Sequence, residues 1–149
     1  MQPLVRTKLT HDPASMEGQA YVPMGLFFEV ETTGSGTATL FTAPAGMYIE
    51  KVIGHIADAF DASSSVDVGY TGSASAFIAN NEWTESTVNQ IAASSQTTAP
   101  DGVYFAAATD IIVTVAGDPD AVGIVRLLFI CWNFTEMASQ GLHGEETVP

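Results

Sequence analysis

The fold is decided by residues 124–134, IVRLLFICWNF, which are apolar except for Arg126 and Asn133. A second run, DIIVTVA at residues 110–116, precedes it and is rich in β-branched side chains. Such residues favour strands, whose successive side chains point to opposite faces of a sheet. A strand that is apolar on both faces must be covered on both. We therefore expect residues 124–134 to meet the core on one side and another surface on the other.

Shorter runs of the same kind fill residues 23–134, separated by turn residues. Gly34-Ser35-Gly36 is expected to be a hairpin turn, and residues 43–46, APAG, a type I turn. A break in alternation predicts a β-bulge near Glu50-Lys51. Residues 82–93 are expected to form a short helix or an irregular excursion. The expected strands are residues 24–33, 37–42, 47–59, 66–71, 76–79, 102–107, 110–116 and 124–134.

This pattern predicts an all-β fold, a β-sandwich or jelly roll of about eight strands, with the two topologies left open. Residues 23–134 form the β-sandwich domain, residues 1–22 an extended N-terminal arm, and residues 135–149 a polar C-terminal tail. The arm has little capacity to fold alone, so we expect it to gain order by lying on a sister subunit or a capsid protein. The residues expected to bind there are Leu4, Val5, Arg6, Lys8 and Leu9.

Charge and composition exclude several classes of protein. The 149 residues include 4 basic and 17 acidic side chains, a net charge of −13, which disfavours a nucleic-acid binder. Only 14% of residues are charged, so partners are expected to cover much of the surface. The single Cys131 excludes an internal disulfide and is expected to be a buried, inert thiol. No signal core or membrane-length apolar stretch is present, which predicts synthesis in a cytoplasm and no membrane partner.

The sequence contains no constellation that supports catalysis. No nucleophile elbow, phosphate-binding glycine loop or zinc-protease motif occurs. Asp58, Asp61 and Asp67 cluster around one loop and could bind Ca²⁺, although Asp61 is better explained as a turn cap. The three histidines are scattered along the chain, and His55 is expected to be a sheet residue or a subunit contact. We therefore expect no enzyme activity and neither a metal nor a cofactor.

Adjacent aromatic pairs indicate which aromatic side chains lie on the surface, where a partner can contact them. In a strand, Phe27-Phe28 and Tyr104-Phe105 each place one ring on either face of the sheet, so one ring of each pair leaves the core. The aromatics expected at an interface are Phe27, Tyr104 and Trp132.

Residues 43–79 and 110–134 resemble a recurring pattern in small virion proteins of tailed bacteriophages. The matching features are the APAG turn at 43–46, AFDASS at 59–64, VDVG at 66–69, FIA at 77–79, and DIIVTVAG at 110–117 followed by the last apolar strand. The resemblance implies a β-sandwich structural protein of the particle, such as a head decoration (cement) protein, or less often a neck or tail component.

Two functions from different classes follow. The first is a capsid decoration protein, a homo-oligomer with a trimer expected, that binds the assembled shell of major capsid protein and stabilises it on the virion surface. The second is a tail or neck structural protein with a carbohydrate-binding β-sandwich, in which Trp83, Tyr70 and Tyr104 would stack on sugars.

Overall fold

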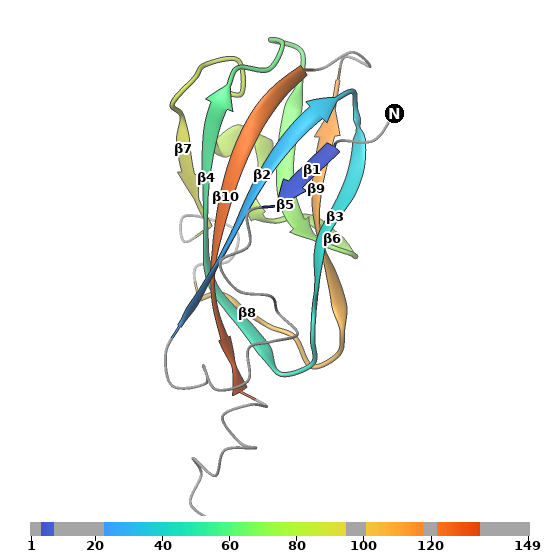
Figure 1. Cartoon of the computed structure of the whole chain (residues 1–149), viewed down its shortest axis with the longest axis vertical. Coiled ribbons are helices and arrows are strands. Elements are labelled where there is room, and N and C mark those ends of the chain that lie inside the picture. The colour runs from blue at the N-terminus through green and yellow to red at the C-terminus, as the bar shows by residue number, and fades with distance from the viewer. Residues whose placement is uncertain (1–3, 8–22, 95–100, 118–121, 135–149) are drawn as a thin grey trace, which may run out of the picture.

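The computed structural model describes residues 4–7, 23–94, 101–117 and 122–134, with residues 4–7 described as backbone. Within these ranges the chain forms ten strands and one 3₁₀ turn. The strands make two antiparallel sheets that face each other, so the fold is an all-β sandwich (Figure 1).

The larger sheet contains six strands in the order β1-β2-β10-β4-β7, with β8 also paired to β4. Its members are β1 (Leu4–Thr7), β2 (Met24–Thr33), β4 (Met47–Asp58), β7 (Ile91–Ala93), β8 (Val103–Tyr104) and β10 (Val122–Asn133). The smaller sheet has the order β3-β9-β5-β6. It consists of β3 (Gly36–Ala43), β5 (Ser65–Tyr70), β6 (Ser73–Ile78) and β9 (Thr109–Ala116).

Strand β10 lies between β2 and β4 and pairs with both along most of its length. Its side chains alternate between the two faces. Val125, Leu127, Phe129 and Cys131 point inward and are fully buried, whereas the residues between them lie on the outer face. The sequence run that is apolar on both faces is therefore the central strand of the larger sheet.

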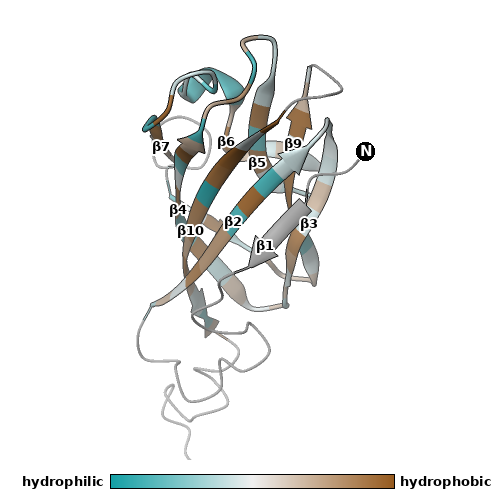
Figure 2. Cartoon of the chain, turned by 45° about the horizontal axis from the view of Figure 1, so that its top comes forward, coloured by the Kyte–Doolittle hydropathy of each residue, from teal (hydrophilic) through white to brown (hydrophobic). Residues whose placement is uncertain are grey.

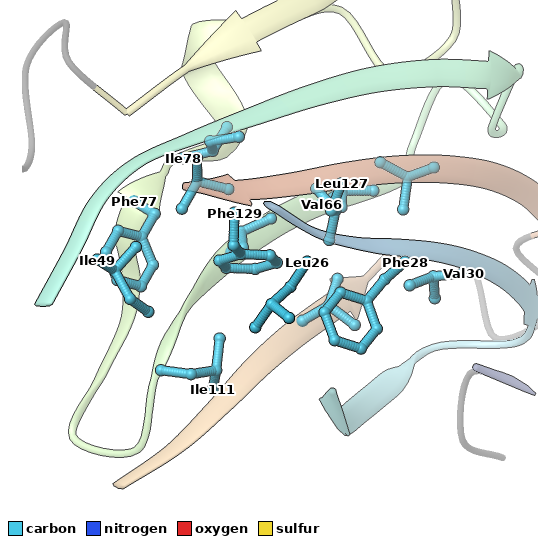
Figure 3. Close-up of a cluster of buried hydrophobic side chains, with 14 of the residues drawn as sticks. Leu26, Phe28, Val30, Ile49, Val66, Phe77, Ile78, Ile111, Leu127 and Phe129 are labelled. Carbon is cyan, nitrogen blue, oxygen red and sulfur yellow. The ribbon is translucent and has the colours of Figure 1, made fainter. Parts of the chain in front are cut away.

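An aromatic cluster joins the two sheets in the core (Figure 3). The Phe129 ring of β10 meets Phe41 of β3 and Phe77 of β6 edge-on, at centroid distances of 5.3 and 6.3 Å. Phe28 of β2 stacks on Phe41 at 5.4 Å and meets Phe129 edge-on at 5.7 Å. Both geometries are favourable for aromatic rings. Phe28 and Phe129 come from the larger sheet and Phe41 and Phe77 from the smaller one, so this cluster holds the sheets together.

Trp83 is a second bridge between the sheets. It follows the 3₁₀ turn η2 (Asn80–Glu82), is 6% exposed, and donates a hydrogen bond from Nε1 to the Val66 carbonyl of β5 at 3.0 Å. Its ring lies against Gly54 of β4, where a Cβ would come within 2.5 Å of Cζ3. Glycine at this position therefore leaves the space that the indole ring occupies.

Glu85 fixes the same loop to the smaller sheet. The side chain is buried, and its Oε1 accepts a hydrogen bond from the Val66 amide at 3.1 Å. Burial raises the pKa of the Glu85 carboxyl above its ordinary value of 4.5, and the neighbouring Asp67 charge adds to the rise. Burial likewise raises the pKa of Cys131 to about 12, which agrees with the expected inert thiol.

Most of the expected strands are found, and the bulge is confirmed. Ile130 of β10 pairs with Lys51 and the next residue, Cys131, with Ile49, so Glu50 is the extra residue of β4. Of the two alternatives for residues 82–93, the irregular excursion is found: the turn η2 ends at Glu82, no helix follows it in this segment, and β7 occupies Ile91–Ala93. The strand expected at residues 102–107 shrinks to the two residues of β8.

Two features of the fold differ from the prediction. Gly34 and Ser35 join β2 to β3, but these strands lie in different sheets, so no hairpin forms there. The cause is the aromatic core, which requires Phe28 and Phe41 to face each other from opposite layers. Residues 4–7, expected in an extended arm that lies on a sister subunit or a capsid protein, form β1 and pair with β2 of the same chain. The rest of the arm, including Lys8 and Leu9, lies outside the described residues, as does the tail.

Gly54→Ala tests the packing of Trp83. We expect the variant to lose about 1–3 kcal/mol of unfolding free energy, because the new methyl group overlaps the indole ring. Chemical denaturation measures it. Gly25→Ala on β2 is the matched control, since its Cβ would meet Leu128 Cδ1 at an ordinary 3.4 Å. It should be neutral or stabilising by about 0.5 kcal/mol. Equal losses in both variants would contradict the packing argument.

Glu85→Gln tests the buried carboxyl through pH. Because the folded-state pKa is raised, the folded protein binds the proton more tightly than the unfolded chain, and stability falls as pH rises from 4.5 through the folded-state value. Glutamine keeps an acceptor for the Val66 amide. Because its side chain does not titrate, the substitution removes the fall of stability with rising pH that Glu85 causes. The stability of Glu85→Gln relative to wild type should therefore be higher at pH 7 than at pH 4 in urea titrations. Asp61→Asn in the exposed loop controls for net charge, and a pH-independent difference would count against the assignment.

Candidate partner-binding surface

The outer face of the larger sheet is apolar across its central strands. Phe27 of β2, Leu128 of β10, Ile53 of β4 and Ala93 of β7 are successive cross-strand neighbours and form what we name the apolar row. Figure 2 shows β10 as mostly hydrophobic along its length. Since the inner face of each strand already packs in the core, these outward side chains serve no packing role between the two sheets.

The outer face of the smaller sheet has the opposite character. Thr37 of β3, Thr114 of β9 and Asp67 of β5 are neighbours in one row across this sheet. The hydroxyls of Thr37 and Thr114 lie 3.1 Å apart, and Thr42 donates to Asp110 at 2.7 Å. Hydroxyls and carboxylates of this kind suit contact with water. This row of the smaller sheet is therefore polar, whereas the row of Phe27, Leu128, Ile53 and Ala93 on the larger sheet is apolar.

An ion pair borders the apolar row. Arg126 of β10 lies between Glu29 of β2 and His55 of β4, and its Nε donates to Glu29 Oε2 at 2.9 Å. His55 is half-buried on this face, as expected for a sheet residue, and its Nε2 lies 3.1 Å from Asn89 Oδ1. Neighbouring Ile91 of β7 is 60% exposed. The charged and polar groups on this outer face of the larger sheet can fix the orientation in which a partner binds.

A second row of side chains across the sheet is aromatic. Tyr104 of β8, Tyr48 of β4 and Trp132 of β10 are successive cross-strand neighbours, which we name the aromatic row. Phe134 packs beside it, with centroid distances of 6.0 Å to Tyr48 and 6.3 Å to Tyr104. Tyr104 is 57% and Phe134 44% exposed, so these rings are open to a partner.

The chain backbone sets the position of Tyr48. Its hydroxyl donates a hydrogen bond to the Asp101 carbonyl, next to Gly102, whose φ is +75°. A Cβ at Gly102 would come within 2.8 Å of the Tyr48 ring. Glycine therefore permits both the turn and the close approach that leads into β8.

An open pocket of about 330 Å³ lies beside the aromatic row. The Trp132 indole donates from Nε1 to Glu50 Oε2 at 2.9 Å, so the carboxylate is held at the pocket. Glu50 reaches this position because it is the bulged residue of β4. The residues that line the pocket are Tyr48, Glu50, Trp132 and Phe134.

The expected interface aromatics lie on one face but not in one cluster. Phe27 belongs to the apolar row, whereas Tyr104 and Trp132 share the aromatic row. The prediction missed Tyr48 and Phe134 as surface residues, and Glu50 as a pocket residue. Strand alternation places Tyr48 and Trp132 outward, but only the pairing of β4 with β10 makes them neighbours.

The sugar-binding alternative loses its main residue. Trp83 is buried between the sheets and cannot stack on a glycan. Tyr70 packs into the core edge-on to Phe105 at 5.3 Å, and of the three expected platforms only Tyr104 is exposed.

The acidic loop residues are not gathered into a metal site. Asp67 Oδ1 accepts a hydrogen bond from the Asn80 amide at 2.9 Å, and the Asp61 carbonyl accepts one from the Ser64 amide at 2.9 Å. Across the described residues, no three histidine, cysteine or acidic side chains are grouped to hold a metal ion. The described part of the chain also has no helix with the length and hydropathy needed to cross a bilayer.

The fold is shared with chains from two bacteriophage capsid structures. A chain of the acidic stable capsid structure of Helicobacter pylori bacteriophage KHP30 is 15% identical with a TM-score of 0.52, covering 86% of this chain and 92% of that chain. A chain of the cyanophage Pam1 capsid asymmetric unit is 19% identical with a TM-score of 0.55, covering 85% and 94%. The sequence matches no protein-family model and no curated protein. The resemblance to phage virion proteins is thus confirmed at the level of the fold.

Leu128→Lys tests whether the apolar row is an interface. We expect the substitution to weaken self-association at least about tenfold, because a partner would have to bury the ammonium group. Light scattering over a range of protein concentrations measures it. Thr114→Lys, at the outer face of the smaller sheet, is the matched control and should leave association unchanged. Each variant should keep its thermal unfolding within a few degrees of wild type, and equal effects on association would contradict the assignment.

Proposed function

We propose that this protein is a bacteriophage capsid decoration (cement) protein, which binds the assembled shell of major capsid protein through the outer face of its larger sheet. The observation that carries the proposal is the contrast between the two outer faces: apolar and aromatic rows cross the larger sheet, whereas a row of threonine and aspartate crosses the smaller one. The fold shared with two capsid structures supports the same reading.

The mechanism is passive and needs no cofactor. A protein that binds the assembled shell but not its separated subunits stabilises the shell by mass action, by about 2.7 kcal/mol per site at a hundred times the dissociation constant. Aromatic side chains dominate the binding energy of many interfaces, which fits the exposed Tyr104 and Phe134. No catalytic step enters this account.

Charge favours a place on the capsid surface. Residues 23–134 carry 2 basic and 12 acidic side chains, a net charge of −10, which repels packaged nucleic acid. The partners we propose are a basic region of the major capsid protein and sister copies of this chain, with a trimer as the closed symmetric form. Synthesis in the host cytoplasm completes the proposal.

The N-terminal arm supplies a further contact in this proposal. Strand β1 is the edge of the larger sheet and pairs with β2, and residues 8–22 join these two strands in the sequence. Leu4, Val5, Arg6, Lys8 and Leu9 remain the residues proposed to meet a neighbour.

Co-sedimentation with purified shells tests the function. We expect the protein to pellet with assembled shells and not with unassembled capsid subunits, and mass spectrometry should find it in purified virions. Binding should survive Thr114→Lys and be lost in Leu128→Lys.

A chain that lacks residues 8–20 but keeps β1 isolates the arm, and we expect its shell binding to weaken. Absence of the protein from purified virions, together with no binding to shells, would overturn the decoration role. Unchanged binding without residues 8–20 would overturn the proposed contact of Lys8 and Leu9 alone.

A further inference from the structure

The pocket beside the aromatic row combines three rings with a carboxylate. Tyr48 and Trp132 are cross-strand neighbours, and Phe134 packs on Tyr48 at 6.0 Å. The fourth lining residue, Glu50, is exposed and accepts one hydrogen bond, from Trp132 Nε1. An ionised carboxylate has room for several more donors.

The pocket holds no cation of its own. None of its four lining residues is basic. Lys51 follows Glu50 directly but is the partner of Ile130 and does not line the pocket, and Arg126 is paired with Glu29. The electrostatics of the site are therefore set by the carboxylate and by the negative faces of the rings.

The free-energy cost of filling this pocket depends on the charge of the group that fills it. A neutral, apolar group would strip water from the Glu50 carboxylate and supply no counter-charge, which is costly. A cation would instead pair with Glu50 and lie over the ring faces. The net charge of −10 on residues 23–134 favours a basic partner in the same way.

The geometry points to a binding site for an arginine side chain, supplied by an extended basic segment of the partner. A guanidinium group is flat, stacks on aromatic rings and pairs with a carboxylate through two parallel hydrogen bonds, whereas an ammonium group is compact and more strongly hydrated. This inference rests on the proposed function only for the identity of the partner, because the pocket can be tested with a small ligand.

The test is a titration of the ¹⁵N-labelled full chain with N-acetyl-arginine amide, followed by NMR at the indole N–H signals. Trp132→Phe identifies the Trp132 signal, and the other tryptophan, Trp83, is buried and serves as an internal reference. We expect the Trp132 signal to shift and saturate with the arginine derivative and not with its neutral analogue, N-acetyl-citrulline amide.

Two variants distinguish the effect of the Glu50 charge on arginine binding from the effect of the net charge of the protein. Glu50→Gln keeps an acceptor for the indole N–H and removes the negative charge, so the dissociation constant for the arginine derivative should rise about three- to fivefold. Asp61→Asn removes one charge from the exposed loop and should leave it unchanged. Equal shifts with citrulline, equal affinity for N-acetyl-lysine amide, or an unchanged constant in Glu50→Gln would each overturn the arginine site.

Shell binding keeps the two proposals apart. If the arginine derivative binds but wild-type protein ignores assembled shells, the decoration role fails and the pocket stands. If wild-type and Glu50→Gln proteins bind shells equally and no shift is seen with arginine, the pocket inference fails and the decoration role stands.

Discussion

The contact between Phe129 and the rings of the smaller sheet fixes the rest of the molecule. Because Phe129 lies on the central strand β10 and meets both Phe41 and Phe77, it sets which face of that strand points inward. Strand alternation then assigns every other residue of β10 to a side. Pairing with β2 and β4 carries the same assignment across the sheet. The packing of the core thus determines which residues lie on the outer face, although those residues do not themselves pack in the core.

That coupling explains how one chain presents two different surfaces. The inner positions of both sheets are mostly apolar, with Thr32 and Asn133 as buried polar exceptions in the larger sheet, since each layer must cover the other. The outer positions carry no such requirement and differ by sheet. Threonine and aspartate on the smaller sheet suit water, whereas the side chains of the apolar and aromatic rows on the larger sheet are half-buried or exposed. The difference between the layers carries the functional argument.

Alternation predicted the strands well because it is a local signal. Met24–Thr33 was expected at its observed bounds, and the bulge at Glu50-Lys51 followed from a break in period. Local patterns could not place β3 in the other sheet, because that choice depends on distant rings. Nor could they show that Trp83 fills the space above Gly54. Tyr104 and Trp132 were expected at a surface, but the pocket beside them required the register of β10 on β4.

The order of strands in the larger sheet bears on how the chain acquires its structure. Arg126 and Glu29, which face each other across β10 and β2, are separated by 97 residues in sequence. Before β10 pairs with β2 and β4, the larger sheet lacks its central strand. The apolar inner faces of β2 and β4 are then incompletely covered. Contacts this remote slow the search for the native state and prolong the life of aggregation-prone species. A surplus of negative charge on the same chain opposes aggregation during that interval.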